Sequence, residues 1–106
     1  MGCALVIFAN SEGAELVAAA GTVCSVFWAD VVAISVVFVD VVTSWETIIV
    51  FDFPNGEFVE MNSSFGNFGE LVQQISETFG LTDQWLESIK EKREVGATVL
   101  EWESSN

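Results

Sequence analysis

The chain has 106 residues, 51% of them hydrophobic and including nine Phe and four Trp, which is enough to fill the core of one domain. It carries 16 acidic residues against three basic ones, for a formal net charge of −13, and it has no His. Serine triads, Cys-His pairs and His-based zinc sites are therefore excluded, and we expect a binding protein with no catalytic residue, no metal and no cofactor.

The first part of the chain is predicted to form strands. Residues 3–9 are a short β-favouring run, and residues 10–13 (Asn-Ser-Glu-Gly) are typical of a turn. Residues 15–20 are expected to be the hairpin partner, although their Ala content leaves a helix as the alternative. Residues 22–28 predict a third strand, and residues 29–33 a turn or a single helical turn.

The middle of the chain carries the strongest local signal. Residues 34–40 are a nearly continuous apolar run, which predicts a strand covered on both faces or placed at a dimer contact. Two β-rich runs, residues 46–52 and 57–61, flank Asn55 and Gly56. Asn-Gly at this place predicts a hairpin, because Gly accepts a positive φ without a steric penalty.

Beyond residue 64 the apolar period changes from two to about 3.6, which predicts a helix. Its apolar stripe consists of Phe68, Leu71, Val72, Ile75 and Phe79. Asn67 is the expected N-cap, with Glu70 three residues on in a pattern close to a capping box, and Gly80 is placed to end the helix.

A second helix is predicted to follow, capped by Thr82. Its last turn would hold all three basic residues of the chain, Lys90, Lys92 and Arg93. There they oppose the negative end of the helix dipole, which explains them without a nucleic-acid patch. Residues 96–102 could add a final strand.

Together these elements predict a single α+β domain over residues 1–102. We expect an antiparallel sheet of about five or six strands with two C-terminal helices packed on one face. Residues 103–106 are polar and are expected to form a loose tail.

The charge distribution favours a basic protein as partner. Between Met1 and Ile89 there are twelve acidic residues and no basic one. We expect neither nucleic acid nor membrane as partner, since both are bound largely through Lys and Arg. The longest uncharged run, residues 16–29, has 14 residues, fewer than the roughly 18 to 20 that span a bilayer. No secretory signal is visible, so we expect a cytoplasmic protein.

The residues predicted to bind this partner are Trp45, Asp52, Glu57, Glu60 and Trp102. Trp45 lies at a predicted turn and Trp102 stands between two acidic residues, so both are expected to be exposed. Tryptophan concentrates binding energy at interfaces. The three carboxylates belong to the predicted hairpin and would supply charge complementarity.

Two other interpretations stay open. The chain could be a structural or assembly protein that forms homo-oligomers, such as a homodimer, through apolar sheet surfaces, its charge serving solubility alone. It could also be a carboxylate-based enzyme that uses a pair among Glu46, Asp52, Glu57 and Glu60. Sixteen acidic residues in 106 make chance pairs expected, so this second alternative is the weaker one.

The two cysteines, Cys3 and Cys24, are too far apart in sequence for a C-x-x-C motif, and two thiols alone make no zinc site. We expect two buried thiols in a reducing compartment. One disulfide is the alternative, if two strands place the cysteines side by side.

Several segments resemble small bacterial proteins of unassigned function. The resemblance rests on residues 28–34 (Trp-Ala-Asp-Val-Val-Ala-Ile), 45–51 (Trp-Glu-Thr-Ile-Ile-Val-Phe), 67–72 (Asn-Phe-Gly-Glu-Leu-Val) and 100–102 (Leu-Glu-Trp). In those proteins a W-x-D-I-x-x-I segment precedes a hairpin, an N-F-x-E-L helix and a second helix. The layout is also similar to the last strands and helix of bacterial pleckstrin-homology-like domains, which implies a half-barrel. Some small acidic proteins of this kind are immunity proteins beside polymorphic toxins, which implies a similar role here. The resemblance assigns no functional residue.

Overall fold

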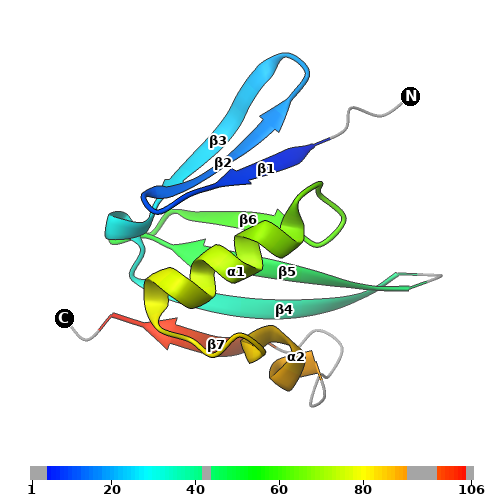
Figure 1. The fold of residues 1–106 in the computed structure, drawn as a ribbon, viewed down its shortest axis with the longest axis vertical. Helices are drawn as coiled ribbons and strands as arrows, with labels where there is room; N and C mark the ends of the chain where they lie inside the picture. The colour runs from blue at the N-terminus through cyan, green and yellow to red at the C-terminus, as the bar shows by residue number, and fades with distance from the viewer. Residues whose placement is uncertain (1–4, 42–43, 91–97, 105–106) are drawn as a thin grey trace.

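A computed structural model describes residues 5–41, 44–90 and 98–104, in which the chain forms two antiparallel sheets and two helices (Figure 1). The first sheet has the order β1 (Val6–Ala9), β2 (Gly13–Ala18) and β3 (Gly21–Phe27). The second has the order β6 (Phe58–Asn62), β5 (Ser44–Asp52), β4 (Ala33–Val41) and β7 (Thr98–Glu103). The α+β class is confirmed, but the described strands form a three-stranded and a four-stranded sheet where the sequence predicted one sheet of five or six strands.

The division into two sheets begins directly after β3. A 3-10 turn, η1 (Trp28–Asp30), redirects the chain there, and the indole Nε1 of Trp28 donates a hydrogen bond of 2.8 Å to the Asn10 carbonyl oxygen. The backbone N–H of Val32 then donates to the Asp52 carbonyl oxygen at 2.8 Å. Because the chain is held by Trp28 and meets β5 next, β4 pairs with β5 and not with β3.

Both predicted hairpins are confirmed. β1 pairs with β2 in antiparallel register, so residues 13–18 form a strand and not the alternative helix. β5 pairs with β6 across the predicted turn, where Gly56 has a φ of 87°. The N–H of Phe53 donates to the Glu57 carbonyl oxygen at 3.0 Å and closes this turn.

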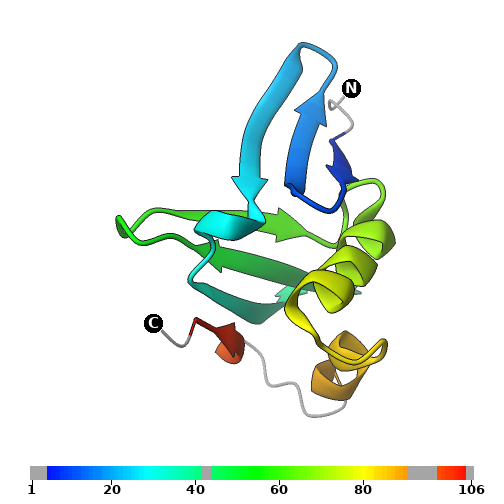
Figure 2. The ribbon, with the colours of Figure 1, turned by 60° about the vertical axis from the view of Figure 1, so that its left-hand side comes forward.

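Helix α1 (Phe68–Phe79) lies across the four-stranded sheet and alongside β1 (Figures 1 and 2). Its predicted end is confirmed, because Gly80 adopts a φ of 70°. The predicted N-cap position, Asn67, is confirmed, but its side chain makes no capping hydrogen bond to the helix. Asn67 has a left-handed backbone with a φ of 65°, and its side-chain Nδ2 donates to the Ile7 carbonyl oxygen at 3.2 Å, so it ties the helix to β1.

The second helix, α2 (Trp85–Lys90), starts later than predicted. Thr82 precedes it by three residues, and the N–H of Trp85 donates to the Thr82 carbonyl oxygen at 3.1 Å. Lys90 is the last residue of the helix as described, whereas Lys92 and Arg93 lie outside the described residues. The predicted final strand is confirmed as β7, which follows α2 and pairs with β4.

One core spans both sheets and both helices. Its fully buried members are Ile7, Ile34, Val36, Phe38, Ile49, Phe51, Met61, Leu71 and Ile75. Trp28 connects the parts, with its ring centroid 5.7 Å from Phe51 on β5 and 5.8 Å from Phe79 on α1. At the C-terminus, Glu103 belongs to β7 and the N–H of Ser104 donates to the Val32 carbonyl oxygen at 2.8 Å, so the expected loose tail is held as far as Ser104.

The loop before α1 also joins the two sheets. Gly66 bridges to β1, since its N–H donates to the Leu5 carbonyl oxygen at 2.8 Å and its own carbonyl oxygen accepts from Ile7 at 2.9 Å. Figure 2 shows the resulting arrangement, in which the three-stranded sheet stands steeply on the four-stranded one.

Candidate functional site

The four-stranded sheet has one face that the rest of the described structure leaves uncovered, which we call the outer face. Side chains alternate along a strand, so β5 directs Ile49 and Phe51 into the core and Ile48, Val50 and Asp52 to the other side. Helix α1 packs against the core side (Figure 1). By the cross-strand register, the outer face comprises Ala33, Ser35, Val37, Val39, Glu46, Ile48, Val50, Asp52, Phe58, Glu60, Asn62, Thr98, Leu100 and Glu103.

The centre of the outer face is apolar. Ile48 and Val50 on β5 lie beside Val37 and Val39 on β4, and all four side chains are partly exposed. Two larger side chains stand more openly at the flanks, where Phe58 on β6 is 59% exposed and Leu100 on β7 is 55% exposed. The face therefore offers a row of aliphatic groups between two protruding apolar ones.

Carboxylates border this apolar centre. Asp52 pairs with Phe58 across the strands, and Glu60 pairs with Val50. At the other end of the same strands, Glu46 accepts a hydrogen bond of 2.9 Å from Asn62 Nδ2, which fixes the direction of its carboxylate. The outer face thus combines an apolar centre with a negatively charged rim.

The structure brings three of the five predicted binding residues to one edge of this face. Asp52 and Glu60 lie on the outer face itself. Glu57 is exposed in the turn directly before β6, where its N–H donates to Asn55 Oδ1 at 3.0 Å. Asp52 and Glu60 occupy diagonal positions on adjacent strands, so a single partner residue can reach both carboxylates.

The two predicted tryptophans lie elsewhere. Trp102 was expected to be exposed, but it pairs with Ile34 on the core side of the sheet, and its ring lies 4.6 Å from that of Phe79. Trp45 is on β5, opposite Asp40 in the register, and its side chain lies outside the described part of the structure. The apolar anchor beside the acidic residues is Phe58, which sequence reasoning did not select. The available signal was the period of two along β6, which places Phe58 on the same face as Glu60.

A separate hollow of about 570 Å³ lies between α2 and β7, and its lining includes Trp85, Ile89 and Val99. Glu101 also lines it. A bulge in the β4–β7 pairing pairs Leu100 with Ser35 and Trp102 with Ile34, which leaves Glu101 as the extra residue. Burial raises the pKa of the Glu101 carboxyl above its ordinary value.

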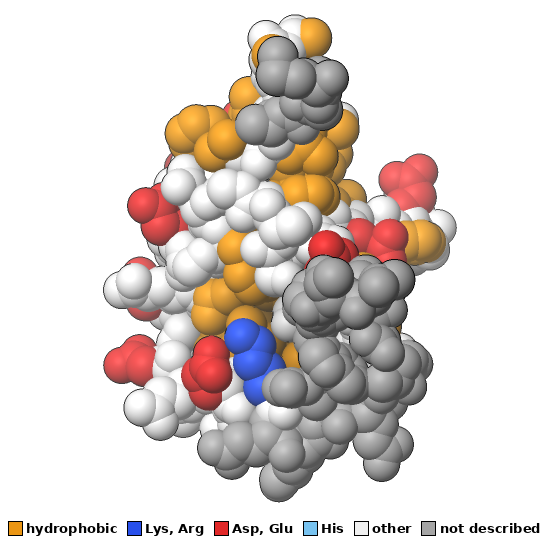
Figure 3. Space-filling model, turned by 90° about the vertical axis from the view of Figure 1, so that its right-hand side faces the viewer, with side chains coloured by type: hydrophobic (Ala, Val, Ile, Leu, Met, Phe, Trp, Pro, Cys, Tyr) orange, Lys and Arg blue, Asp and Glu red, His pale blue; other side chains and the backbone are white. Residues whose placement is uncertain are grey.

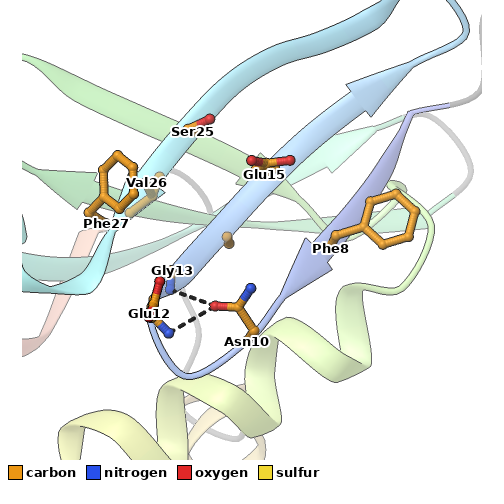
Figure 4. Close-up of a pocket in the computed structure, with 9 residues that line it drawn as sticks. Phe8, Asn10, Glu12, Gly13, Glu15, Ser25, Val26 and Phe27 are labelled. Carbon is orange, nitrogen blue, oxygen red and sulfur yellow. Dashed lines mark hydrogen bonds between the residues drawn. The ribbon is translucent and has the colours of Figure 1, made fainter.

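Sequence reasoning also missed a second open surface, on the side of the three-stranded sheet that faces away from the core. Phe8 and Phe27 are 54% and 60% exposed there. Figure 4 shows them at opposite ends of a shallow pocket, with Glu15 and Ser25 between them. Val26 is buried and Phe27 exposed, but both are apolar, so the sequence of β3 carries no signal that distinguishes this face.

The chemistry of the remaining side chains is limited. Within residues 5–41, 44–90 and 98–104, no group of three or more Cys, Asp or Glu side chains is placed to hold a metal ion. Cys24 carries a free thiol whose pKa burial raises, and β2 lies between its strand and β1; Cys3 is outside the described residues. No helix in the described part of the chain is long and apolar enough to cross a membrane.

Comparison with known proteins gives no match: no family model, no curated protein and no solved structure is similar to this chain.

Proposed function

We propose that this chain is a non-catalytic binding protein that uses the outer face of the four-stranded sheet to bind a basic protein. The observation that supports this proposal is the apolar centre of that face, open between Phe58 and Leu100 and bordered by Glu46, Asp52 and Glu60. An apolar centre with a polar rim is the usual anatomy of a protein–protein interface.

The charge of the chain supports a basic partner. With a net charge of −13, two copies of this protein would repel each other. In a face-to-face dimer, the rim carboxylates of one copy would lie against those of the other. A positively charged partner gains from the same field, which increases the association rate and makes binding sensitive to salt. Figure 3 shows acidic side chains spread widely over one side of the molecule, in keeping with a general attraction for cations.

One kind of relation fits this chemistry well. Enzymes that act on nucleic acid bind phosphates with Lys and Arg, so an acidic sheet face can occupy such a substrate site and exclude the substrate. The proposal therefore includes inhibition of a nucleic-acid enzyme, as in an immunity protein. The apolar residues at the centre of the face would supply most of the affinity, because binding energy concentrates in a few well-packed side chains.

Site-specific photo-crosslinking tests the proposal in cells that carry the gene. A benzophenone amino acid is placed at Phe58 on the outer face, and a matched one at Gln73, which is exposed on α1. We expect the probe at position 58 to crosslink a basic protein. The probe at position 73 should not crosslink that protein. Crosslinking of an acidic protein, or equal crosslinking from both positions, would contradict the proposal.

Salt dependence of the affinity completes the test with the purified partner. We expect the affinity to fall about tenfold or more between 50 and 500 mM NaCl, because screening shortens the reach of the charges. Asp52→Asn with Glu60→Gln should reduce this salt dependence, and Glu77→Gln on α1 should leave it unchanged. An affinity that does not change with salt would contradict the proposed role of the carboxylate rim in binding.

A further inference from the structure

The pocket on the three-stranded sheet places charged and aromatic groups on one open surface. The register aligns Phe8, Glu15 and Ser25 in one row across β1, β2 and β3. Phe27 follows Ser25 on the same side of β3, and the hollow between these groups has a volume of about 200 Å³. Figure 4 shows the Glu15 carboxylate and the Ser25 hydroxyl in the space between the two Phe side chains.

The turn beside this pocket is held rigidly. Asn10 Oδ1 accepts hydrogen bonds from the N–H groups of Glu12 at 2.8 Å and Gly13 at 3.1 Å (Figure 4). The carbonyl oxygen of Asn10 accepts from the Trp28 indole, and that of Glu12 accepts from the Trp28 N–H at 2.9 Å. The carboxylate of Glu12 is therefore carried by a fixed backbone. A site that is ordered before binding loses less entropy when a ligand arrives.

Gly13 lines the pocket at the start of β2. A side chain at this position would bring its Cβ to within 2.0 Å of the Val26 carbonyl oxygen, so β2 and β3 can approach this closely only at a glycine.

The charges in the pocket lack a basic partner within the described chain. Lys90 is the basic residue in the described ranges, and it lies on α2 with its Nζ 3.5 Å from Glu87 Oε1. Glu15 thus presents its carboxylate between two exposed aromatic rings, and Glu12 lines the same pocket from the turn before β2. A guanidinium group matches both features, since it is planar, weakly hydrated, bonds carboxylates with two N–H groups and stacks on aromatic faces.

We propose that this pocket is a second binding site, which takes an arginine side chain from an exposed segment of a protein partner. Glu15 binds the guanidinium, Glu12 adds to the attraction, and Phe8 and Phe27 contact the apolar residues on either side of the arginine. The site lies on a different sheet from the outer face. Experiments can therefore contradict the arginine site while the proposed function holds, or contradict the proposed function while the arginine site holds.

An NMR titration of the full chain tests this site directly. The probe is the peptide acetyl-Val-Arg-Val-amide, compared with matched peptides that carry citrulline or lysine in place of arginine. We expect amide shifts to concentrate at residues 12–15 and 25–27, and affinity for the citrulline peptide to be weaker by about tenfold or more, because citrulline keeps the shape and loses the charge. The lysine peptide should bind more weakly than the arginine peptide.

Variants show whether the named residues carry the binding. Glu15→Gln should weaken arginine-peptide binding about fivefold, the size expected for a partly exposed ion pair, and Phe27→Ser should weaken it similarly. Glu77→Gln on α1 removes the same charge elsewhere and should change nothing. Retained amide dispersion in each variant shows that the chain is folded.

Four outcomes would overturn the proposal. They are the absence of any shift up to about 10 mM peptide, shifts spread evenly over all acidic residues, equal binding of the citrulline or lysine peptide, and equal losses from Glu15→Gln and Glu77→Gln.

Discussion

Both faces of the four-stranded sheet carry apolar side chains at their centre, yet only one of these centres is fully buried. On the core side, Ile34, Val36, Ile49 and Phe51 have no exposed surface. On the outer face, aliphatic residues of the same strands stay partly exposed, and Phe58 keeps 59% of its surface in solvent. A sheet that packs on one side needs polar residues on the other, as most antiparallel sheets have.

This difference in burial distinguishes the face that stabilises the fold from the face that we propose binds a partner. The core side is apolar because burying it drives folding, at about 25 cal/mol for each Å² removed from water. The outer face gains less of this energy, because its side chains stay partly exposed within the described chain. Proteins seldom keep contiguous apolar patches open without a use, so the composition of this face supports the proposal of a partner.

Replacement of equivalent Phe residues on the two faces gives the largest expected effect. Phe51→Ala should lower the free energy of unfolding by about 3–5 kcal/mol, because it leaves a cavity in the core. Phe58→Ala should cost less than about 1 kcal/mol, since most of its side chain is already in water. Urea denaturation of both variants measures the difference. Equal losses would mean that the two faces do not differ as described.

A second prediction extends the comparison to the three-stranded sheet. Gly13→Ala should destabilise the fold by about 1–3 kcal/mol, because the new Cβ meets backbone that must move to make room. Gly69→Ala on α1 is the matched control, since a Cβ there meets no atom within 4 Å. The control should be neutral or slightly stabilising, and thermal unfolding followed by circular dichroism compares the two. Tolerance of Gly13→Ala would show that β2 and β3 are not so closely packed.

A smaller effect is expected at the turn that borders the pocket. Asn10→Ala removes the acceptor for the N–H groups of Glu12 and Gly13, which should cost about 1–2 kcal/mol. Asn55→Ala removes a single acceptor from the exposed turn before β6 and should cost less. Amide hydrogen exchange should show faster opening of residues 10–13 in the first variant. Unchanged protection there would mean that Asn10 does not hold the turn.

The smallest predicted effect is the pH dependence contributed by Glu101. Its folded-state pKa is raised by burial, so the folded state holds this proton to a higher pH than the unfolded state does. Its contribution to stability is therefore present below the unfolded pKa and is lost as the pH rises through the folded pKa. In the Glu101→Gln variant, the free energy of unfolding should vary less between pH 4 and the weakly acidic range than it does in the wild type. A variant with the same pH profile as the wild type would contradict this assignment.

The sequence predicted the local elements well because their signals are local. Asn55-Gly56 identified its hairpin, and Gly80 identified the end of α1. The arrangement of the strands was not predictable in this way, because it depends on Trp28, whose indole reaches a carbonyl 18 positions earlier in the chain. Nor did the sequence show that the side chain of the N-cap residue Asn67 bonds to β1 and not to the first turn of its own helix.

The candidate site was predicted in part. Asp52, Glu57 and Glu60 were selected for their charge, and they lie close together because they share one hairpin. Trp102 was selected for its flanking acidic residues, but the β4–β7 bulge places it on the core side against Phe79. Phe8 and Phe27 escaped notice because hydrophobic residues in strands are normally assigned to the core, and only the packing of the sheets shows which face stays open.

The most direct test of the central claim joins stability and binding in one variant of the outer face. Val50→Thr combined with Phe58→Thr keeps β-favouring side chains while removing apolar surface from the centre of the face. We predict that its free energy of unfolding stays within about 1.5 kcal/mol of the wild type, and that its affinity for the crosslinked basic partner falls about 100-fold. Destabilisation as large as that of Phe51→Ala, or an affinity within about threefold of the wild type, would show that this face serves the fold and not a partner.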